Sequence, residues 1–504
     1  MTLQTENPYF AAIDLGSNSF HLLVVKVNDG VIEKIDRVKE MVQIARGLNN
    51  HELAGDSQER AITCLERFQE RIRDIPDSQI RVVGTKALRS ANNAKDFLRR
   101  AEKALGHSID IISGYEEARL VYLGVSNDIS KDKGRRLVID IGGGSTEFII
   151  GEGEQTFQME SLSIGCVTYS DRFITRDQED APEHITTEMI WQTYYATCVE
   201  LGHIARTYLR SGWDISVGSS GTMRAIAQLM QEDIVTGIIT KEGLNKLVNQ
   251  LHTHGHLSEL EDIPAKRRNV LPAGIIILSA IFDQLKLEEI HVVDSALKEG
   301  LIYDTIGRMT TDDIRNNTID KMMAQYQIDQ DQATRVDTTL LYFAKRLPSP
   351  VVYGISVQKL LHWAAQLHEV GLTISHSGYH HHGHYLIQQS DMAGFSRFEQ
   401  ELLALLVGSH RRKIHAQRLT LFTAENQQML HPLLACLRLA VLLNQRREDA
   451  IELPNLTVQR YDNETLEIYL TLPDGWLDDH PLTQHNLAQE QRYLAPLNIN
   501  LHYV

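Results

Sequence analysis

Residues 10–27, FAAIDLGSNSFHLLVVKV, and residues 136–151, RLVIDIGGGSTEFIIG, have the same pattern. In each stretch a run of β-branched and other apolar residues ends in an aspartate, Asp14 or Asp140, passes through a loop of small polar residues and continues as a second apolar run. Glycines in such loops let backbone N–H groups approach a ligand closely, and these donors suit phosphate oxygens. One loop is weak evidence, because Gly/Ser hairpin turns are common. Two loops predict a duplicated domain that binds a phosphate chain between its halves.

The repeat continues beyond the two hairpins, which strengthens the prediction. Each hairpin is followed by a third predicted strand, VIEKIDRV in the first half and QTFQMESLSI in the second. Residues 82–85 then correspond to residues 217–222, and each half closes with a strand and a helix, near 109–123 and near 290–304. Two unrelated α/β domains would not explain this ordered agreement. We therefore predict a duplicated α/β fold.

Length and composition limit the remaining possibilities. The chain has 504 residues, which is enough for several domains with large cores. Its 4 cysteines are far apart and lack metal-ligand spacing, which favours a reduced, cytoplasmic setting. We expect no membrane span, because no long uncharged apolar run occurs, and no secretory signal at residues 1–10. The formal net charge of −16 argues against nucleic-acid binding, although a local cleft can still attract a polyanion.

The pattern changes at about residue 305, where a helical period replaces the strand pattern. We expect an all-α domain there, followed by a small α+β tail that contains an apolar helix and two strands joined at 462–464. The predicted domains are 1–124, 125–305, 306–428 and 429–504. Within the helical domain, Arg411, Arg412 and Lys413 lie in a stretch without acidic residues. That stretch is either a solvated basic loop or a patch that binds polyanions.

One glutamate has the position of a catalytic base. Residues 113–117, SGYEE, fit a capping box in which Ser113 is the N-cap and Glu116 lies three residues later. Glu117 lies one residue beyond the box, at a helix start that follows a strand, where α/β folds place their sites. Such a carboxylate can deprotonate a water that attacks phosphorus. From spacing alone the alternative is favoured, because acids in a first helical turn usually serve the helix dipole.

Carboxylates beside the second loop suggest a metal site. Asp140 and Glu147 flank the GGGST loop on the two strands that it joins, and Asp14 has the position of Asp140 in the first half. Hard carboxylate oxygens near phosphates are what Mg²⁺ prefers. In the alternative, Asp140 caps the loop backbone and Glu147 is a surface residue.

The histidines of the helical domain are a weaker signal. His368 and Glu369 precede a run with several further histidines, 380–384, and imidazoles that lie close together can bind a transition metal. No HExxH spacing is present, which argues against a zinc protease. We expect the histidine run to form an exposed loop.

The chain resembles the exopolyphosphatase/guanosine pentaphosphate phosphatase family, which belongs to the actin-like, sugar kinase and Hsp70 superfamily. The resemblance rests on AAIDLGSNSFHLLV, RVVGTKALR, IISGYEEARLVYLGV, LVIDIGGGSTE, VGSSGT and the EGLIYD helix, over residues 10–304. The stretch from HWAAQLHEVG to DMAGF is similar to the helical HD-like domain of long proteobacterial exopolyphosphatases. The implied fold has duplicated actin-like (ribonuclease H-like) domains, an HD-like all-α domain and a C-terminal α+β module. Because Glu369 stands where active HD enzymes have Asp, we expect no hydrolysis in the helical domain.

The resemblance also implies roles for individual residues. Glu117 matches the catalytic base, and Asp140 and Glu147 match metal contacts. The residues that match phosphate contacts are Ser17, Asn18, Arg89, Gly143, Gly144, Ser145, Gly218, Ser219, Ser220 and Gly221. Arg411, Arg412 and Lys413 suit a channel for a polymeric substrate. The implied cofactor is Mg²⁺, with K⁺ as a candidate activator.

The implied activity is an exopolyphosphatase that processively releases orthophosphate from the end of inorganic polyphosphate. The alternative, alone or as a second activity, is a 5′-phosphatase that converts guanosine pentaphosphate (pppGpp) to ppGpp. Gly144 favours polyphosphate, because the pentaphosphatase branch often has Ala there, and 410–414, HRRKI, favours it too. An ATP-dependent kinase or chaperone would need an adenosine pocket, and only the generic VGSSGT loop could mark one. A non-enzymatic regulator that binds polyanions would gain nothing from Glu117 and Glu147 beside phosphate unless a metal bridged them. The family further implies a homodimer. Peripheral attachment of this cytoplasmic protein to the inner membrane is an additional candidate, although no amphipathic basic helix indicates it.

Overall fold

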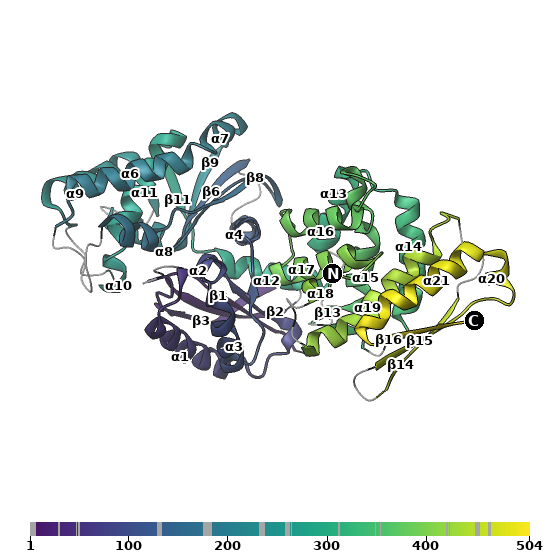
Figure 1. The fold of residues 1–504 in the computed structure, drawn as a ribbon. Helices are drawn as coiled ribbons and strands as arrows, with labels where there is room; N and C mark the ends of the chain where they lie inside the picture. The colour runs from purple at the N-terminus through teal and green to yellow at the C-terminus, as the bar shows by residue number, and fades with distance from the viewer. Residues whose placement is uncertain are drawn as a thin grey trace. The chain divides into compact units, whose positions relative to one another are not determined.

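The structure is a computed structural model, and the residues that it describes are 7–28, 31–46, 48, 51–128, 134–174, 184–230, 237–257, 263, 265–310, 313–347, 349–352, 354–419, 422, 424–448, 454–461 and 465–504. The chain divides into two compact units, Met1–Asp313 and Ile314–Val504 (Figure 1). Both predicted hairpins belong to the first unit. None of the helices formed by the described residues combines the length and the apolar character that a membrane crossing requires.

The first unit contains two sheets that share one topology. The first sheet has the spatial order β3 (Val31–Glu40), β2 (Phe20–Asn28), β1 (Tyr9–Leu15), β4 (Ile80–Gly84) and β5 (Asp110–Ile111). The second has the order β10 (Ile238–Thr240), β11 (Glu289–Val292), β9 (Ile215–Ser219), β6 (Arg135–Ile141), β7 (Thr146–Glu152) and β8 (Gln155–Leu162). In each sheet the first strand of an antiparallel hairpin also pairs in parallel with a later strand, β1 with β4 and β6 with β9. Taken from its other edge, the second sheet has the order β8, β7, β6, β9, β11 and β10. Apart from the additional strand β10, this order corresponds strand by strand to that of the first sheet, which confirms the predicted duplication.

Helices cover both sheets. In chain order they are α1 (Gly55–Ile72), α2 (Lys86–Ser90), α3 (Ala94–Leu105), α4 (Gly114–Asp128), α5 (Cys166–Tyr169), α6 (Thr187–Leu201), α7 (Ala205–Ser211), α8 (Ser220–Leu229), α9 (Lys241–His254), α10 (Ala265–Arg268), α11 (Leu271–Leu285) and α12 (Leu297–Met309). The predicted boundary between residues 305 and 306 therefore falls inside α12, and the chain divides after Asp313 instead.

The helices α4 and α12 have corresponding places, because each follows the last strand that its half contributes in parallel. Their apolar side chains share one buried cluster with residues of both sheets, such as Phe10 and Val138. Glycines bring the two helix backbones together. A β-carbon at Gly300 would lie 1.8 Å from the carbonyl oxygen of Leu120, and one at Gly124 would lie 2.2 Å from that of Ala296. A larger residue at either glycine would force the helices apart, so the contact fixes how closely α4 and α12 approach.

The second unit is mainly helical. Its elements are α13 (Ile314–Gln325), α14 (Gln330–Ala344), β12 (Val351–Val352), β13 (Ile355–Ser356), α15 (Val357–Leu367), α16 (Tyr379–Gln389), α17 (Arg397–Ser409), α18 (Ala416–Leu419), α19 (Ala424–Leu443), β14 (Asn455–Tyr461), β15 (Thr465–Thr471), α20 (Trp476–Asp479), α21 (Pro481–Leu494) and β16 (Ile499–Tyr503). The predicted helical domain is thus present, with one short β12–β13 pair in addition.

The C-terminal tail differs in detail from its prediction. The strands β14 and β15 are antiparallel as expected, while the predicted turn at 462–464 lies outside the described residues. A third strand, β16, pairs in parallel with β15 and was not predicted. Apolar residues of the helices and of this sheet, such as Leu403 and Ile468, belong to one hydrophobic cluster. The predicted boundary between residues 428 and 429 falls inside α19, so the tail packs as part of the unit.

Candidate active site

The two hairpin loops meet. A β-carbon at Gly143 would lie 3.0 Å from the backbone nitrogen of Asn18, and one at Gly144 would lie 2.9 Å from the hydroxyl oxygen of Ser17. Only glycine allows two backbones to approach this closely without displacing a neighbour. The predicted juxtaposition of the loops is therefore present, and their N–H groups can serve one ligand.

The two loops also have the same internal geometry. A β-carbon at Gly16 would lie 2.9 Å from the carbonyl oxygen of Ser19, and one at Gly142 would lie 3.0 Å from that of Ser145. The residues before and after the loops are cross-strand partners, Asp140 with Glu147 and Asp14 with His21. The first half thus carries a histidine where the second carries its glutamate. The duplicated site is asymmetric in charge.

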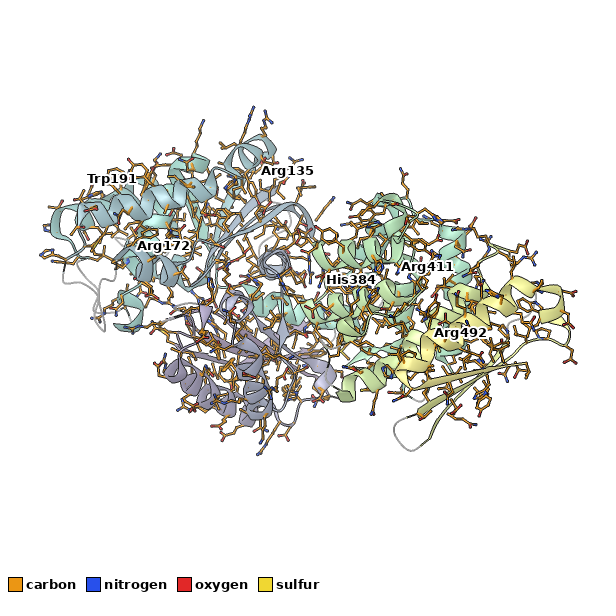
Figure 2. The ribbon with its side chains drawn as sticks, viewed as in Figure 1. Arg135, Arg172, Trp191, His384, Arg411 and Arg492 are labelled. Atoms are coloured by element: carbon orange, nitrogen blue, oxygen red, sulfur yellow. The ribbon has the colours of Figure 1, made fainter. Side chains whose placement is uncertain are left out.

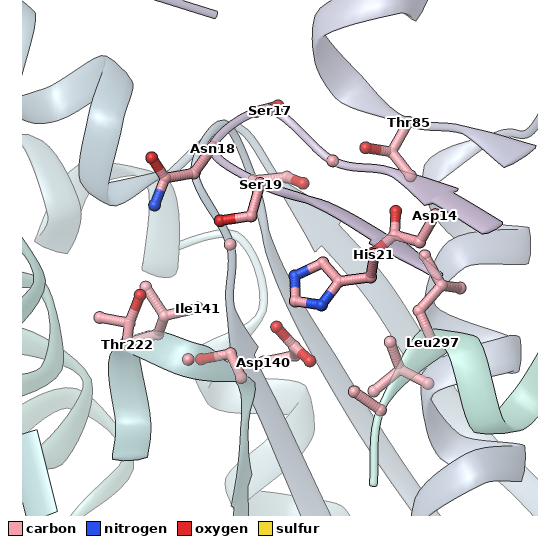
Figure 3. A pocket seen from close by; sticks show the side chains of 18 of the residues that line it. Asp14, Ser17, Asn18, Ser19, His21, Thr85, Asp140, Ile141, Thr222 and Leu297 are labelled. Carbon is pink, nitrogen blue, oxygen red and sulfur yellow. The ribbon is translucent and has the colours of Figure 1, made fainter. Parts of the chain in front are cut away.

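Acidic side chains from both halves line a pocket between the loops. They are Asp14, Glu117, Asp140, Glu147 and Asp294. Figure 3 shows Asp14, His21 and Asp140 projecting into it from the strands, with Thr222 of α8 and Leu297 of α12 beside them. Asp140 is 8% exposed and Glu147 is 2% exposed, so the alternative of a surface strand residue is wrong for Glu147.

The start of α4 places Glu117. The Ser113 hydroxyl accepts a hydrogen bond from the Glu116 N–H at 3.1 Å, which is one half of the predicted capping box. Both carboxylate oxygens of Glu116, the other predicted member, accept from Arg119. A β-carbon at Gly114 would lie 2.6 Å from the Cβ atom of Ser161, so the helix start packs tightly on β8. The Ser161 hydroxyl in turn donates to Glu147 Oε1 at 2.8 Å. Glu117 and Glu147 are thus held by adjoining elements.

Arg89 is the basic neighbour of Glu117. Its Nη1 and Nη2 atoms lie 3.4 Å from Glu117 Oε2, and Nη1 also donates to the Ile112 carbonyl at 2.6 Å. The shorter contact shows that the guanidinium is tied mainly to the backbone before α4. Glu117 therefore keeps a carboxylate that is only loosely paired.

Burial raises the pKa of each of four pocket carboxyls above its ordinary value. The pKa of Asp14 is raised to about 8, first by burial and then by the charge of Glu117. Burial raises the pKa of Asp140 to about 6. Burial and the charge of Asp140 raise the pKa values of both Glu117 and Glu147. The charge of Glu117 also raises the pKa of Glu147, whereas Arg89 acts to lower the pKa of Glu117. A cation placed among these acids would therefore stabilise their ionised forms.

Cations gather on another part of the same pocket. Lys39, Arg224, Arg267 and Lys298 line it, and they come from β3, α8, α10 and α12. Burial, followed by the charges of Arg267 and Arg224, lowers the pKa of Lys39 to about 7. Arg224 pairs with Asp294, and Lys298 pairs with Glu299 at 2.9 Å. A cluster of cations of this kind can attract anionic groups.

Most of the predicted phosphate contacts line the pocket. They are Ser17, Asn18, Gly143, Gly144, Ser145, Ser220 and Gly221. Arg89 reaches the site through Glu117 instead. Gly218 and Ser219 belong to β9, outside the described lining, and the Ser219 hydroxyl donates to the Ser295 carbonyl at 3.0 Å. These two residues therefore lie at the end of β9, directly before the lining residue Ser220.

The sequence reasoning missed several lining residues, chiefly His21 and the four cations. His21 had a usable signal, since hairpin symmetry pairs it with Asp14. Lys39 follows from the same rule one strand further, because it is the cross-strand partner of His21. Lys298 had a signal in the repeat, since the pairing of residues 109–123 with 290–304 sets it opposite Glu117. Arg267 had no such signal, because it reaches the pocket through the packing of α10.

The pocket carboxylates fit a magnesium ion only in part. In the described portion of the chain, no three His, Cys, Asp or Glu side chains are arranged to hold a metal by themselves. Mg²⁺ commonly takes one or two carboxylates and completes its shell with water and phosphate oxygens. The acidic lining can supply one or two carboxylates of this kind. A metal here would therefore take its remaining ligands from water and from the phosphate groups of the substrate.

The histidines of the second unit are arranged differently from the prediction. His380, His381 and His382 lie on the helix α16 and not in an exposed loop. His368 and His410 are buried, their rings lie 5.6 Å apart, and burial lowers both pKa values, which keeps them neutral. Each donates from Nδ1 to a backbone carbonyl, of Ala365 and Val407 respectively. Glu369 pairs with Arg447 at 2.6 Å, so an arginine neutralises this carboxylate.

The basic residues at 411–413 belong to the second unit. His384 and Arg411 both lie in its helical part (Figure 2). The Arg411 guanidinium lies 4.6 Å from the centre of the Tyr379 ring, and Arg412 has a left-handed backbone with a φ of 60°. The Arg412 carbonyl accepts a hydrogen bond from buried Arg438 at 2.7 Å. This hydrogen bond fixes the turn formed by the basic segment.

Comparisons with known proteins agree with this architecture. The model of the Ppx/GppA phosphatase family matches residues 23–309, and the model of Ppx/GppA phosphatase, domain III, matches residues 314–491. The chain is 37% identical over 514 aligned residues to guanosine-5′-triphosphate,3′-diphosphate pyrophosphatase of Vibrio cholerae, with 100% of both chains covered. The crystal structure of an exopolyphosphatase from Cytophaga hutchinsonii has a TM-score of 0.54 and 22% identity, and covers 60% of this chain and 99% of that chain. That likeness concerns the fold.

Proposed function

The chain belongs to the Ppx/GppA phosphatase family, a family of phosphoanhydride hydrolases, and from this premise we propose that it removes the terminal phosphoryl group of pppGpp. Inorganic polyphosphate is the second proposed substrate. The order reverses the one favoured by the sequence, because the relative that matches the whole chain carries the name of a pppGpp-cleaving enzyme. The observation that carries the chemistry is the pocket itself, in which separate acidic and basic groups surround two phosphate-binding loops.

The chain's own side chains suffice to describe substrate binding and water activation. Backbone N–H groups of the loops, together with Ser17 and Ser145, bind the terminal phosphoryl oxygens. Lys39, Arg224 and Lys298 bind the anionic groups that follow. Glu117 accepts a proton from the attacking water and aligns it with the bond that breaks. Arg89 favours the ionised form of Glu117, because its charge opposes the effect of burial on the pKa.

Asp140 and Glu147 would hold Mg²⁺, which when bound neutralises charge on the transferred phosphoryl group and the leaving oxygen. These two residues fit the ion because they are cross-strand partners beside the glycine loop and lie in the acidic part of the pocket. K⁺ is proposed as an activator. For polyphosphate, the turn formed by Arg411, Arg412 and Lys413 is proposed to bind further phosphates of a long chain.

A comparison of substrates tests the proposed function. We expect purified protein with Mg²⁺ to release phosphate from pppGpp and from long-chain polyphosphate, with the larger kcat/KM for pppGpp. The two values are measured in one preparation by phosphate release. A larger kcat/KM for polyphosphate would reverse the order of substrates. Binding of both compounds without any turnover would overturn the proposal and favour a regulator.

The pH profile should report Glu117. A general base must be deprotonated, so kcat/KM falls as the pH drops through its pKa, which burial holds above the ordinary value of 4.5. Arg89→Met removes a charge that lowers this pKa, and we therefore expect the acidic limb of the profile to move to higher pH. The measurement is kcat/KM for pppGpp from pH 5 to about 9 in wild type and variant.

A matched control is Arg99→Met, because Arg99 pairs with Asp96 on the exposed face of α3, where both side chains are largely accessible. This variant should keep the wild-type profile. An acidic limb that stays in place in Arg89→Met, or that moves to lower pH, would contradict the assignment of the limb to Glu117.

A further inference from the structure

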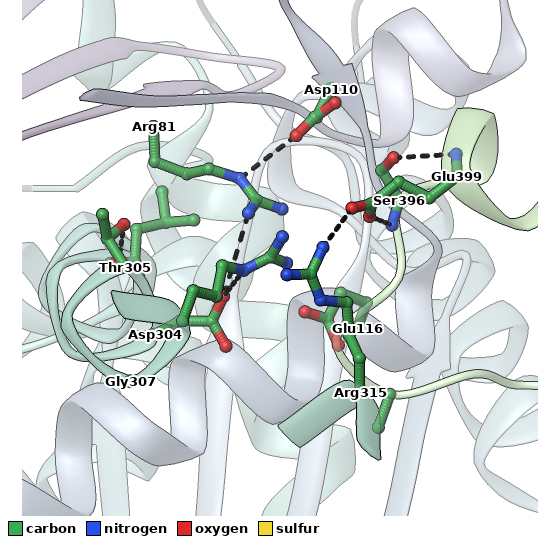
Figure 4. A network of polar contacts seen from close by, with 12 residues as sticks. Arg81, Asp110, Glu116, Asp304, Thr305, Gly307, Arg315, Ser396 and Glu399 are labelled. Carbon is green, nitrogen blue, oxygen red and sulfur yellow. Dashed lines mark hydrogen bonds and ion pairs between the residues drawn. The ribbon is translucent and has the colours of Figure 1, made fainter. Parts of the chain in front are cut away.

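A buried network of charged side chains connects α4, the helix that carries Glu117, to α12. Arg119 of α4 donates from Nε and Nη2 to both carboxylate oxygens of Glu116, at 2.8 Å each, and from Nη2 to Asp304 Oδ1 at 2.5 Å. Figure 4 shows Glu116 and Asp304 of this network. On α12, Arg308 donates to Asp304 Oδ2 at 2.8 Å. Glu116 is 0% exposed and Asp304 is 5% exposed. The network therefore joins two helices inside the protein.

The network extends to the first sheet. Arg81 of β4 lies with Nη1 4.0 Å from Asp304 Oδ2 and with Nε 3.1 Å from Asp110 Oδ2 of β5. Burial alone would raise the pKa of Asp304, but Arg119, Arg308 and Arg81 together hold it below the ordinary value. Asp304 thus remains ionised and accepts from donors on several elements at once.

Glu116 and Glu117 are consecutive, so about 100° of helix rotation separates their side chains. Glu116 points into the network, while Glu117 lines the pocket. We propose that Glu116, Arg119 and Asp304 form a positioning network that fixes the rotation and register of α4 against α12 and thereby aims Glu117 at the attacking water. This inference rests on the proposed function, in which Glu117 is the base.

The magnitudes support a positional effect. A carboxylate about 6 Å from a helix axis moves by about 1 Å when the helix turns by about 10°. A displacement of about 1 Å costs a catalytic group about 100-fold in rate. Apolar packing could stabilise the crossing of α4 and α12 equally well, and a buried ionic network is weak evidence for stability as such. Bidentate pairing of Arg119 adds directional contacts that a methyl group cannot provide.

The network acts on geometry and not on charge. Burial has the largest effect on the Glu117 pKa, and the strongest neighbouring charges are those of Arg89, Asp140 and Lys86. Substitutions in the positioning network of Glu116, Arg119 and Asp304 should therefore change the rate without moving the pH profile. A substitution of Arg89 should move it. The response of the pH profile therefore distinguishes residues that position Glu117 from residues that change its pKa.

The test uses Arg119→Lys and Glu116→Gln in the full-length protein with Mg²⁺ and pppGpp. Lys keeps the charge of Arg119 but cannot donate to Glu116 and Asp304 with the same geometry. Gln keeps the shape of Glu116, so it serves if the lysine variant fails to fold. For each variant we expect kcat per folded molecule to fall by about 10- to 100-fold, with KM within about threefold and the acidic limb in place.

A matched control is Arg308→Met, which removes a contact of Asp304 made within α12 and leaves the contact to α4. It should lower the melting temperature and leave kcat per folded molecule within about twofold of wild type. Unchanged kcat in Arg119→Lys and Glu116→Gln would overturn the proposal and leave the network a structural role. A shift of the acidic limb like that of Arg89→Met would overturn it in favour of an electrostatic role. If wild type hydrolyses neither pppGpp nor polyphosphate, the proposed function itself fails.

Discussion

Glu117→Gln should lower kcat for phosphate release by about 100- to 10,000-fold, because the amide cannot accept the proton of the attacking water. Binding should be retained or tightened, since the variant removes a buried negative charge from a pocket that receives a polyanion. The measurement is phosphate release from pppGpp, together with calorimetric titration of pppGpp into the same preparation. A rate loss without an affinity loss is the signature of a group that acts in the transition state.

The control for this experiment is Glu152→Gln, which makes the same chemical change at the exposed end of β7. It should have the wild-type rate. A Glu117→Gln enzyme with more than about a tenth of the wild-type kcat would show that another carboxylate activates the water. Asp14 and Glu147 are then the next candidates, because both line the same pocket.

The parts of the fold that the sequence predicted are those encoded locally. Each hairpin has its own alternation and its own turn, so the pairing of Asp140 with Glu147 follows from residues next to one another in the chain. The duplicated order of strands could be predicted because the same local signals recur in the same sequence. The helical pattern of α15 and α17 was equally local, and both helices are present.

The parts that the sequence did not reveal depend on tertiary packing. Arg267 lines the pocket because α10 packs near it, and its position does not differ locally from that of an ordinary helical cation. The contact of Arg119 with Asp304 joins residues 185 positions apart in the chain. The strand β16 has few residues and pairs with β15 across α21. In such cases local patterns carry no information on the partner.

Arg438 shows the same limit within the second unit. The stretch LLACLRLAVLL of α19 predicts an apolar core helix, and an arginine in its middle would ordinarily be expected at the surface. Arg438 is nevertheless 1% exposed. Its Nη2 atom lies 3.0 Å from Glu490 Oε2 of α21, and it also donates to the carbonyls of Ser409 and Arg412. This side chain therefore connects α19, α21 and the basic turn.

Arg438→Met should lower the free energy of unfolding of the second unit by about 3–5 kcal/mol, because it leaves the Glu490 carboxylate buried without its cation. The two carbonyls would lose donors as well, which should loosen the turn at 410–413. Hydrogen exchange of α19 and of this turn, measured by mass spectrometry, reports the unit separately from the rest of the chain. Global unfolding would mix two units and is less suitable.

The contrast with a surface pair makes the prediction specific. Arg446→Met breaks an ion pair with Glu448 in which both side chains are more than half exposed, and it should change stability by about 0.5 kcal/mol at most. The double variant Arg438→Met, Glu490→Leu should recover most of the loss, since it removes both buried charges together. If Arg438→Met costs no more than Arg446→Met, the guanidinium does not stabilise the unit. In a further outcome, Arg438→Met loses much of the free energy of unfolding and the double variant recovers it. The destabilisation then comes from the unpaired Glu490 carboxylate. Arg438 in that case determines the shape of the basic turn rather than its stability.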